Sequence, residues 1–208
     1  LFEETDKDIF DPFIELEQIE KFKLSFTNIR NQEVTLASLA GFLKSKEKQL
    51  RHLSLNFYDT ELDYGEFEVL FDKLIYLQNL ESLQLLIFGI QFSTMEQPYI
   101  FEAIRAMKNL NKLVLKLPRV DLEVDEIWDN IGESIIYLSK LEYLEISLLR
   151  NVNRQFSDSN SLIKNLYSLR RLKEFYLDIR EDTSRFENYG LTFRPRFCPL
   201  YNSRKCVV

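Results

Sequence analysis

The sequence is poor in the residue types that most catalytic and metal-binding sites use. Its 208 residues include two cysteines, Cys198 and Cys206, and one histidine, His52. Two cysteines are too few for a disulfide framework, and together with one histidine they give no spacing typical of a zinc site. Glycine-rich phosphate loops and nucleophile elbows are also missing. We therefore expect no enzyme, no metal and no cofactor, and an intracellular, cytoplasmic protein.

The sequence also lacks a long hydrophobic run and an excess of positive charge. Its most apolar stretch, residues 80–92, is shorter than the ~20 residues that a membrane-spanning helix needs, and it includes Glu81. The formal net charge is −6, which argues against a uniformly basic surface for nucleic acid. We expect no membrane span and no small-molecule substrate.

What the sequence does contain is a repeat. Six related phrases begin at residues 19, 50, 80, 110, 141 and 172, at intervals of 30 or 31 residues. In order they read IEKFKLSF, LRHLSLNF, LESLQLLI, LNKLVLKL, LEYLEISL and LKEFYLDI. So constant a spacing is typical of a solenoid, in which each unit buries its apolar face against its neighbours.

Each repeat predicts one strand and one helix. The fourth, sixth and eighth residues of a phrase are apolar and alternate with outward-facing positions, as in a strand with one buried face. Between the phrases, apolar residues recur every three or four positions, which indicates helices. The helical stripes run from Leu36 to Leu43, Phe67 to Leu77, Ile100 to Met107, Ile127 to Leu138 and Leu162 to Leu169. The predicted fold is an α/β solenoid, a curved horseshoe of about six repeats with a parallel sheet on the concave face and helices on the convex face.

The phrase LxxLxLx[FIL] at these intervals resembles the leucine-rich repeat family, in particular its long-repeat, ribonuclease-inhibitor-like variety. The resemblance covers residues 19–180 and implies a non-enzymatic protein-binding scaffold or adaptor, or a structural subunit of a larger assembly. An enzyme inhibitor or activator is an alternative that the resemblance also allows. The ninth position departs from the family's Asn or Cys: it holds Thr27, Tyr58, Phe88, Pro118, Leu149 and Arg180.

The two ends differ from the repeats. Residues 1–18 are expected to form an N-terminal cap or the end of an earlier repeat, with Asp11 capping a helix and Pro12 in its first turn. Residues 181–208 are expected to form a C-terminal cap or a basic tail. From residue 190 onward this tail has no acidic residue and carries Arg194, Arg196, Arg204 and Lys205.

The outward positions of the strands are the candidate binding residues. The last two strands present an aromatic-acidic patch of Tyr143, Glu145, Glu174, Tyr176 and Asp178. We expect it to bind a protein partner through a basic segment, because tyrosine is a favoured interface anchor. An ordinary polar strand surface without a binding role is a second interpretation.

A ribonucleoprotein component is the alternative function. Its RNA would contact the lysines of the first four strands, Lys21, Lys23, Lys112 and Lys116, together with the four basic residues of the tail. His52 shares the outward face and is expected to be exposed to solvent or to face a partner.

Overall fold

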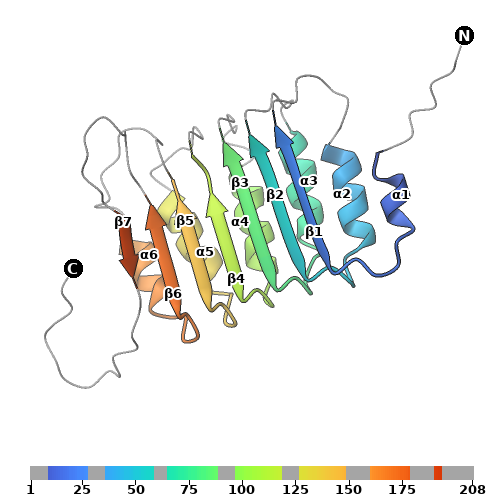
Figure 1. The fold of residues 1–208 in the computed structure, drawn as a ribbon. Helices are drawn as coiled ribbons and strands as arrows, with labels where there is room; N and C mark the ends of the chain where they lie inside the picture. Colours follow the sequence, from blue (N-terminus) through green and yellow to red (C-terminus); the bar gives the residue numbers. More distant parts are fainter. Residues whose placement is uncertain are drawn as a thin grey trace, which may run out of the picture.

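The computed structural model describes residues 9–27, 36–58, 65–88, 97–118, 127–148, 160–178 and 190–193. These segments form one seven-stranded sheet with the helices packed on one of its faces (Figure 1). The strands are β1 (Lys21–Thr27), β2 (His52–Tyr58), β3 (Ser82–Phe88), β4 (Lys112–Lys116), β5 (Tyr143–Ser147), β6 (Glu174–Asp178) and β7 (Gly190–Phe193). The helices are α1 (Asp11–Ile14), α2 (Leu36–Ser45), α3 (Glu66–Leu74), α4 (Gln97–Ala106), α5 (Ile127–Ile135) and α6 (Asn160–Leu166).

The sheet is a stack of repeats in sequence order. Strands β1 to β6 are parallel, and each pairs with the next along the chain without a crossover. The register places equivalent residues of successive phrases side by side, for example Lys21 beside His52 and His52 beside Ser82. The predicted α/β solenoid is therefore confirmed, with the sheet on one side and the helices on the other.

The core lies between the sheet and the helix layer. In β2, Leu53, Leu55 and Phe57 are at most 1% exposed and point toward the helices. The helical stripes meet them from the other side, with Leu70 and Phe71 of α3 fully buried. Burial of this continuous apolar layer is the main source of stability in a solenoid, and it confirms the predicted inward and outward positions.

The turns from helix to strand repeat with the same hydrogen bonds. In the second repeat the N–H of Leu77 donates to Leu74 O and that of Leu80 donates to Leu77 O, and the later repeats match this pattern. The second residue of each phrase forms backbone hydrogen bonds with the equivalent residue of the neighbouring repeat. For example, the Arg51 N–H donates to Glu20 O and the Glu81 N–H donates to Arg51 O, each at 2.8 Å. These turns form one continuous edge of the solenoid.

The N-terminal segment carries a short helix, α1, that packs against the first full repeat. Phe10 takes the N-cap position of α1 without a side-chain cap bond, so the prediction of Asp11 as the cap is wrong. Asp11 is instead the first helical residue, because the aromatic ring of Phe10 packs on Phe42 at 5.7 Å and fixes the start of the helix. Pro12 lies in the first turn, where its missing N–H costs nothing.

Lys46 ties this segment to the first full repeat. It occupies the buried turn position that Leu77, Met107, Leu138 and Leu169 hold in later repeats, and it is 3% exposed. Its Nζ donates to Ile14 O at 2.6 Å and to Leu16 O at 2.8 Å. The carbonyl of Ile14 at the end of α1 and that of Leu16 just beyond it therefore receive a charged donor.

The C-terminal end carries a strand that the sequence analysis did not predict. β7 pairs antiparallel with β6, placing Phe193 beside Phe175 and Gly190 beside Asp178. The last strand of the parallel stack is thereby paired on both of its edges. None of the helices in the described segments is long and apolar enough to cross a membrane.

Candidate functional site

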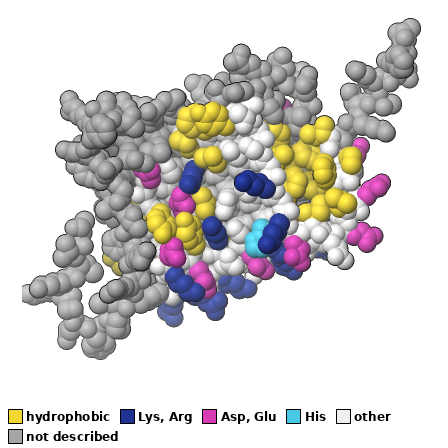
Figure 2. All heavy atoms as spheres, viewed as in Figure 1, with side chains coloured by type: hydrophobic (Ala, Val, Ile, Leu, Met, Phe, Trp, Pro, Cys, Tyr) yellow, Lys and Arg dark blue, Asp and Glu magenta, His cyan; other side chains and the backbone are white. Residues whose placement is uncertain are grey.

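The face of the sheet opposite the helices is the candidate site, and we refer to it as the open face (Figures 1 and 2). Three rows of outward side chains cross it, one residue per strand from β1 to β6. The rows are Lys21, His52, Ser82, Lys112, Tyr143 and Glu174; Lys23, Ser54, Gln84, Val114, Glu145 and Tyr176; and Ser25, Asn56, Leu86, Lys116, Ser147 and Asp178. Because the sheet fixes the backbone of each row, these side chains project from a rigid surface.

Strands β4, β5 and β6 bring together a compact group, the tyrosine cluster, made of Lys112, Lys116, Tyr143, Glu145, Glu174 and Tyr176. The Tyr143 hydroxyl donates to Glu145 Oε2 at 2.8 Å, and Lys116 Nζ lies 2.6 Å from Glu145 Oε1. The Tyr143 and Tyr176 rings are 5.4 Å apart at an interplanar angle of 37°.

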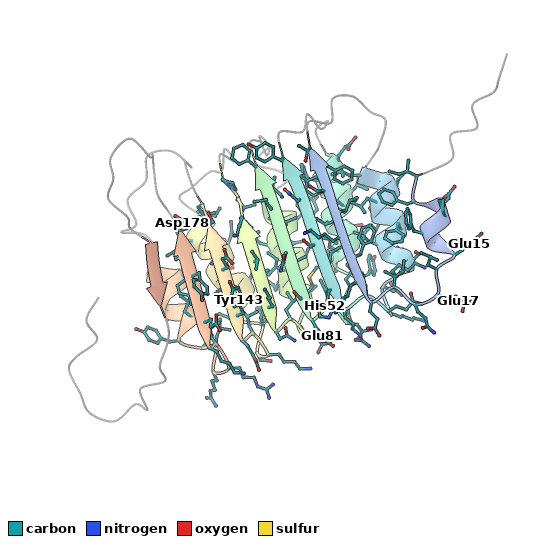
Figure 3. All side chains as sticks on the ribbon, viewed as in Figure 1. Glu15, Glu17, His52, Glu81, Tyr143 and Asp178 are labelled. Carbon is teal, nitrogen blue, oxygen red and sulfur yellow. The ribbon has the colours of Figure 1, made fainter. Side chains whose placement is uncertain are left out.

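Two further contacts complete the tyrosine cluster. Lys112 Nζ lies 4.7 Å from the centre of the Tyr143 ring, in a cation–π contact. The Tyr176 hydroxyl donates to Glu174 Oε2 at 3.0 Å. Figure 3 labels Tyr143, which projects from β5 on the open face. Both tyrosine rings are therefore held in place by contacts within the protein itself.

The tyrosine cluster also perturbs two titrating groups. Partial burial raises the pKa of the Tyr143 hydroxyl well above its usual range, and the hydrogen bond to Glu145 raises it further. Burial alone would raise the pKa of Glu145, but the hydrogen bonds from Lys116 and Tyr143 outweigh burial and lower it. Glu145 is therefore an ionised acceptor and Tyr143 a neutral donor over the physiological pH range.

An apolar band leads from the top of the open face into the tyrosine cluster. It consists of Tyr58, Phe88, Leu86, Val114, Tyr143 and Tyr176. Val114 contributes little of the exposed area, because 8% of its surface is exposed. Tyr58 and Phe88 stack at 4.4 Å with an interplanar angle of 8°, and Tyr58 keeps 42% of its surface exposed. The band crosses five strands, or roughly 19 Å at the usual strand spacing. Lysines flank it on β4, at the two positions next to Val114 on the same face.

The structure places the predicted patch residues on one face, but it groups them with two lysines that the sequence analysis had assigned to a separate set. Tyr143, Glu145, Glu174 and Tyr176 lie together through hydrogen bonds and a ring contact. Lys112 and Lys116, however, do not form a separate lysine side, because β4 is the neighbour of β5 and the register brings both lysines against Tyr143 and Glu145. The carboxylate of Glu145 is thus already paired within the protein.

The remaining predicted residues lie farther away. Asp178 is half-buried at the end of β6 beside Ser147, and its backbone carbonyl accepts from the Leu148 N–H at 2.8 Å. Lys21 and Lys23 are exposed on β1, three strands from Lys112. Arg194, Arg196, Arg204 and Lys205 lie outside the described residues.

Sequence reasoning missed the apolar part of the site. The alternation of each strand already places Leu86 and Val114 on the outward face. Because they are apolar residues at outward positions, they could have been identified from the sequence as part of the site. Tyr58 and Phe88 fill the ninth position of their phrases, where the departure from Asn or Cys is visible in the sequence. Together these four residues extend the aromatic patch across the sheet.

No arrangement suited to a metal ion stands out in the described segments, where three or more His, Cys, Asp and Glu side chains nowhere form a group. His52 is half-buried on the open face in the row of Lys21. The described part of the site therefore offers hydrogen-bonding groups and apolar surface for binding.

The architecture is that of an α/β leucine-rich-repeat solenoid. Among solved structures, the chain is similar to the tropomodulin C-terminal domain from Caenorhabditis elegans, which has the same type of fold. The TM-score is 0.51 at 10% sequence identity, over 77% of this chain and 89% of that domain. At this identity the likeness shows the fold alone. No protein-family model matches the sequence, and no curated protein matches it.

Proposed function

We propose that the protein is a non-enzymatic protein-binding scaffold or adaptor that uses the open face of its sheet. The observation that carries the proposal is the apolar band, which ends at two tyrosines held by hydrogen bonds. Aromatic side chains with a fixed geometry contribute much apolar area to an interface at little entropic cost.

The chemistry of the tyrosine cluster specifies the partner segment. Glu145 is engaged by Lys116 and Tyr143, so its carboxylate contributes little further attraction. Glu174 is exposed and accepts one hydrogen bond, from Tyr176, so it retains capacity for a cation. The partner presents apolar side chains to the band and a Lys or Arg to Glu174.

Several finer features belong to the same proposal. A helix between each pair of successive parallel strands, from β1 to β6, and a period of 30 or 31 residues favour the long-repeat, ribonuclease-inhibitor-like variety. A sequence with two cysteines suits an intracellular, cytoplasmic setting. The rigid sheet suits a structural subunit that holds partners in a larger assembly.

The test is affinity capture from an extract of the source cells, comparing the wild type with the double variant Tyr143→Ala, Tyr176→Ala. We expect the variant to lose at least one protein that the wild type retains, because two interface anchors are removed. Hydrogen exchange of the isolated complex should then show protection of β4, β5 and β6.

The matched control removes two exposed apolar side chains from the helix side. Val69 and Tyr76 are 41% and 45% exposed, so the variant Val69→Ala, Tyr76→Ala should fold and capture as the wild type does. If both double variants capture the same proteins as the wild type, the open face is not the binding surface. Glu174→Lys separates charge from apolar contact, since it should weaken only a partner that supplies a cation.

A further inference from the structure

The turns from helix to strand carry a second surface, which the proposed function does not use. In the last three full repeats these turns span residues 106–111, 137–142 and 168–173. We call their five exposed cations the basic turn edge: Lys108, Lys140, Arg170, Arg171 and Lys173. In Figure 2 the dark-blue side chains gather along the lower edge of the molecule, below β4 to β6.

The charge of this edge changes sign along the solenoid. We call the turns at residues 106–111, 137–142 and 168–173 the basic half of the edge. They hold five cations and one acid, Glu142. The equivalent turns of the other half, residues 15–20, 46–51 and 76–81, hold three cations and five acids. One of those three cations, Lys46, is buried. Figure 3 shows Glu15 and Glu17 at this N-terminal end, pointing away from β1.

Helix dipoles do not account for the basic half. Cations are favoured at the C-terminus of a helix, where the partial charge is negative. Both halves of the edge follow helix C-termini, α1, α2 and α3 on one side and α4, α5 and α6 on the other. A dipole effect would therefore enrich cations in both halves alike, and the chain as a whole has a net charge of −6.

Most of these cations keep their charge available. Lys140 Nζ donates to the neutral Asn109 Oδ1 at 2.6 Å, which leaves its charge uncompensated. Lys173 pairs with Glu142 at 2.6 Å, but both side chains are exposed and such a pair is weak. Among the described residues, Lys108, Arg170 and Arg171 make no ion pair.

Two exposed tyrosines accompany the cations. Tyr167 keeps 86% of its surface exposed just before Arg170 and Arg171, and Tyr137 keeps 48% exposed just before Lys140. The Arg105 guanidinium lies 5.7 Å from the centre of the Tyr137 ring, in a cation–π contact. Each of the last two turns thus pairs an aromatic ring with one or more cations.

We propose that the basic turn edge, with Tyr137 and Tyr167, binds a single strand of nucleic acid. Cations neutralise the phosphates, and exposed rings stack on unpaired bases, which is how proteins bind single strands without reading their sequence. The repetition of cation and ring from one repeat to the next fits a periodic polyanion better than a folded acidic protein. Arginine suits phosphate because its planar fork donates two parallel hydrogen bonds.

The test measures fluorescence anisotropy of a labelled single-stranded RNA of about 20 nucleotides titrated with the full chain. If all five cations contact phosphates, the logarithm of the binding constant should fall against the logarithm of salt with a slope of about −3.5. The variant Arg170→Gln, Arg171→Gln should reduce the magnitude of that slope by about 1.4.

Tyr167→Ala tests stacking separately from charge. It should weaken binding roughly 5- to 150-fold while leaving the salt slope unchanged, because a ring adds no counterion release. A duplex of the same sequence should bind more weakly than the single strand, since its bases are already stacked.

The matched control is Lys44→Gln, Lys48→Gln, two exposed cations in and just before the turn of residues 46–51 on the acidic half. It should leave RNA binding unchanged, and all variants should keep the melting temperature of the wild type because the altered side chains lie at the surface.

Three results would overturn the proposal. The first is no binding at about 50 mM salt, where phosphate contacts are strongest. The second is that Arg170→Gln, Arg171→Gln and its control weaken RNA binding equally. The third is competition by poly-glutamate as effective as that by unlabelled RNA, which would assign the edge to an acidic protein.

Discussion

The interior repeats and the N-terminal segment share the same pattern of apolar residues, but these residues are buried in the repeats and exposed in the segment. Leu70, Leu74 and Leu77 of the second repeat are at most 1% exposed. Ile9, Phe13 and Leu16 stand at the same distances before their strand, yet they are 49%, 44% and 50% exposed. The residues are equally apolar, so the difference comes from their neighbours. Among the described residues, an interior repeat is covered on both sides and the N-terminal segment on one.

The comparison shows that a side chain in a repeat is buried because a neighbouring repeat covers it, and not because of its own residue type alone. Strand β1 illustrates this, since Phe22 and Leu24 are half-buried whereas Leu53 and Leu55, beside them in register, are buried. The stability of each unit is therefore shared with its neighbours, as expected for a one-dimensional array. Mutations at equivalent positions should have unequal costs.

The largest effect is expected from Leu55→Asp. This change places a carboxylate without a partner in the layer between sheet and helices, at a cost of several kcal/mol, comparable with the stability of a domain. Circular dichroism should show loss of cooperative folding. Ser54→Asp, at the adjacent outward position, is the control and should fold normally. A Leu55→Asp protein that melts like the wild type would contradict the inward assignment.

A matched pair of alanine variants measures the difference between the two regions directly. Leu70→Ala should lower the free energy of unfolding by about 2 to 5 kcal/mol, because it leaves a cavity in a filled core. Ile9→Ala, at the equivalent position, should cost under about 1 kcal/mol because half of its side chain already contacts water. Urea denaturation of both variants gives the values. Equal costs would mean that Ile9 is covered in solution.

Lys46→Met tests how the N-terminal segment is attached. Methionine keeps the apolar stem at a turn position where another repeat has Met107, but it removes the donor to Ile14 O and Leu16 O. We expect exchange of the Phe13 and Ile14 amides to accelerate by about tenfold, with little change in the melting temperature. Unchanged exchange rates would show that the aromatic contacts with Phe42 alone hold α1.

The smallest effect is expected from pH at the tyrosine cluster. The folded protein holds the pKa of Glu145 below its unfolded value of 4.5. Its contribution to stability is therefore present above pH 4.5 and is lost as the pH falls through the folded pKa. Tyr143 acts oppositely: its folded pKa is raised above 10.0, so its contribution is lost as the pH rises above that value.

Two variants separate these contributions. Relative to the wild type, Glu145→Gln should be less stable at pH 7, and the gap should narrow toward pH 3. Tyr143→Phe should remove part of the stability loss above pH 10. Thermal melts across the pH range test both, and a constant gap for Glu145→Gln would contradict the lowered pKa.

Much of the fold follows from spacing alone. The interval of 30 or 31 residues predicts the order of strands and helices, and the alternation within each phrase assigns Leu53, Leu55 and Phe57 to the core, where they are found. These predictions succeed because local periodicity determines which side of a strand or helix is apolar. The prediction of Asp11 as a cap rests on a local preference, and it fails because the packing of Phe10 on Phe42 shifts the start of the helix.

The candidate site can be predicted only in part. The sequence places Tyr143, Glu145, Glu174 and Tyr176 outward, but it separates Lys112 and Lys116 from them by about one to two repeats. Their contact arises when β4 pairs with β5 and long side chains reach across the strands. The apolar band is hard to predict for the same reason, since its members are scattered over five strands.

By itself the sequence determined a repeating unit of strand and helix, the apolar side of each, and a stack of parallel strands in chain order. Only the tertiary structure decided which side chains meet across strands, which cations stay unpaired on the turn edge, and that β7 closes the last edge by antiparallel pairing. Periodicity is a property of neighbouring residues and can be read along the chain. Contacts between repeats depend on register and side-chain reach, which the chain acquires only when the repeats have stacked.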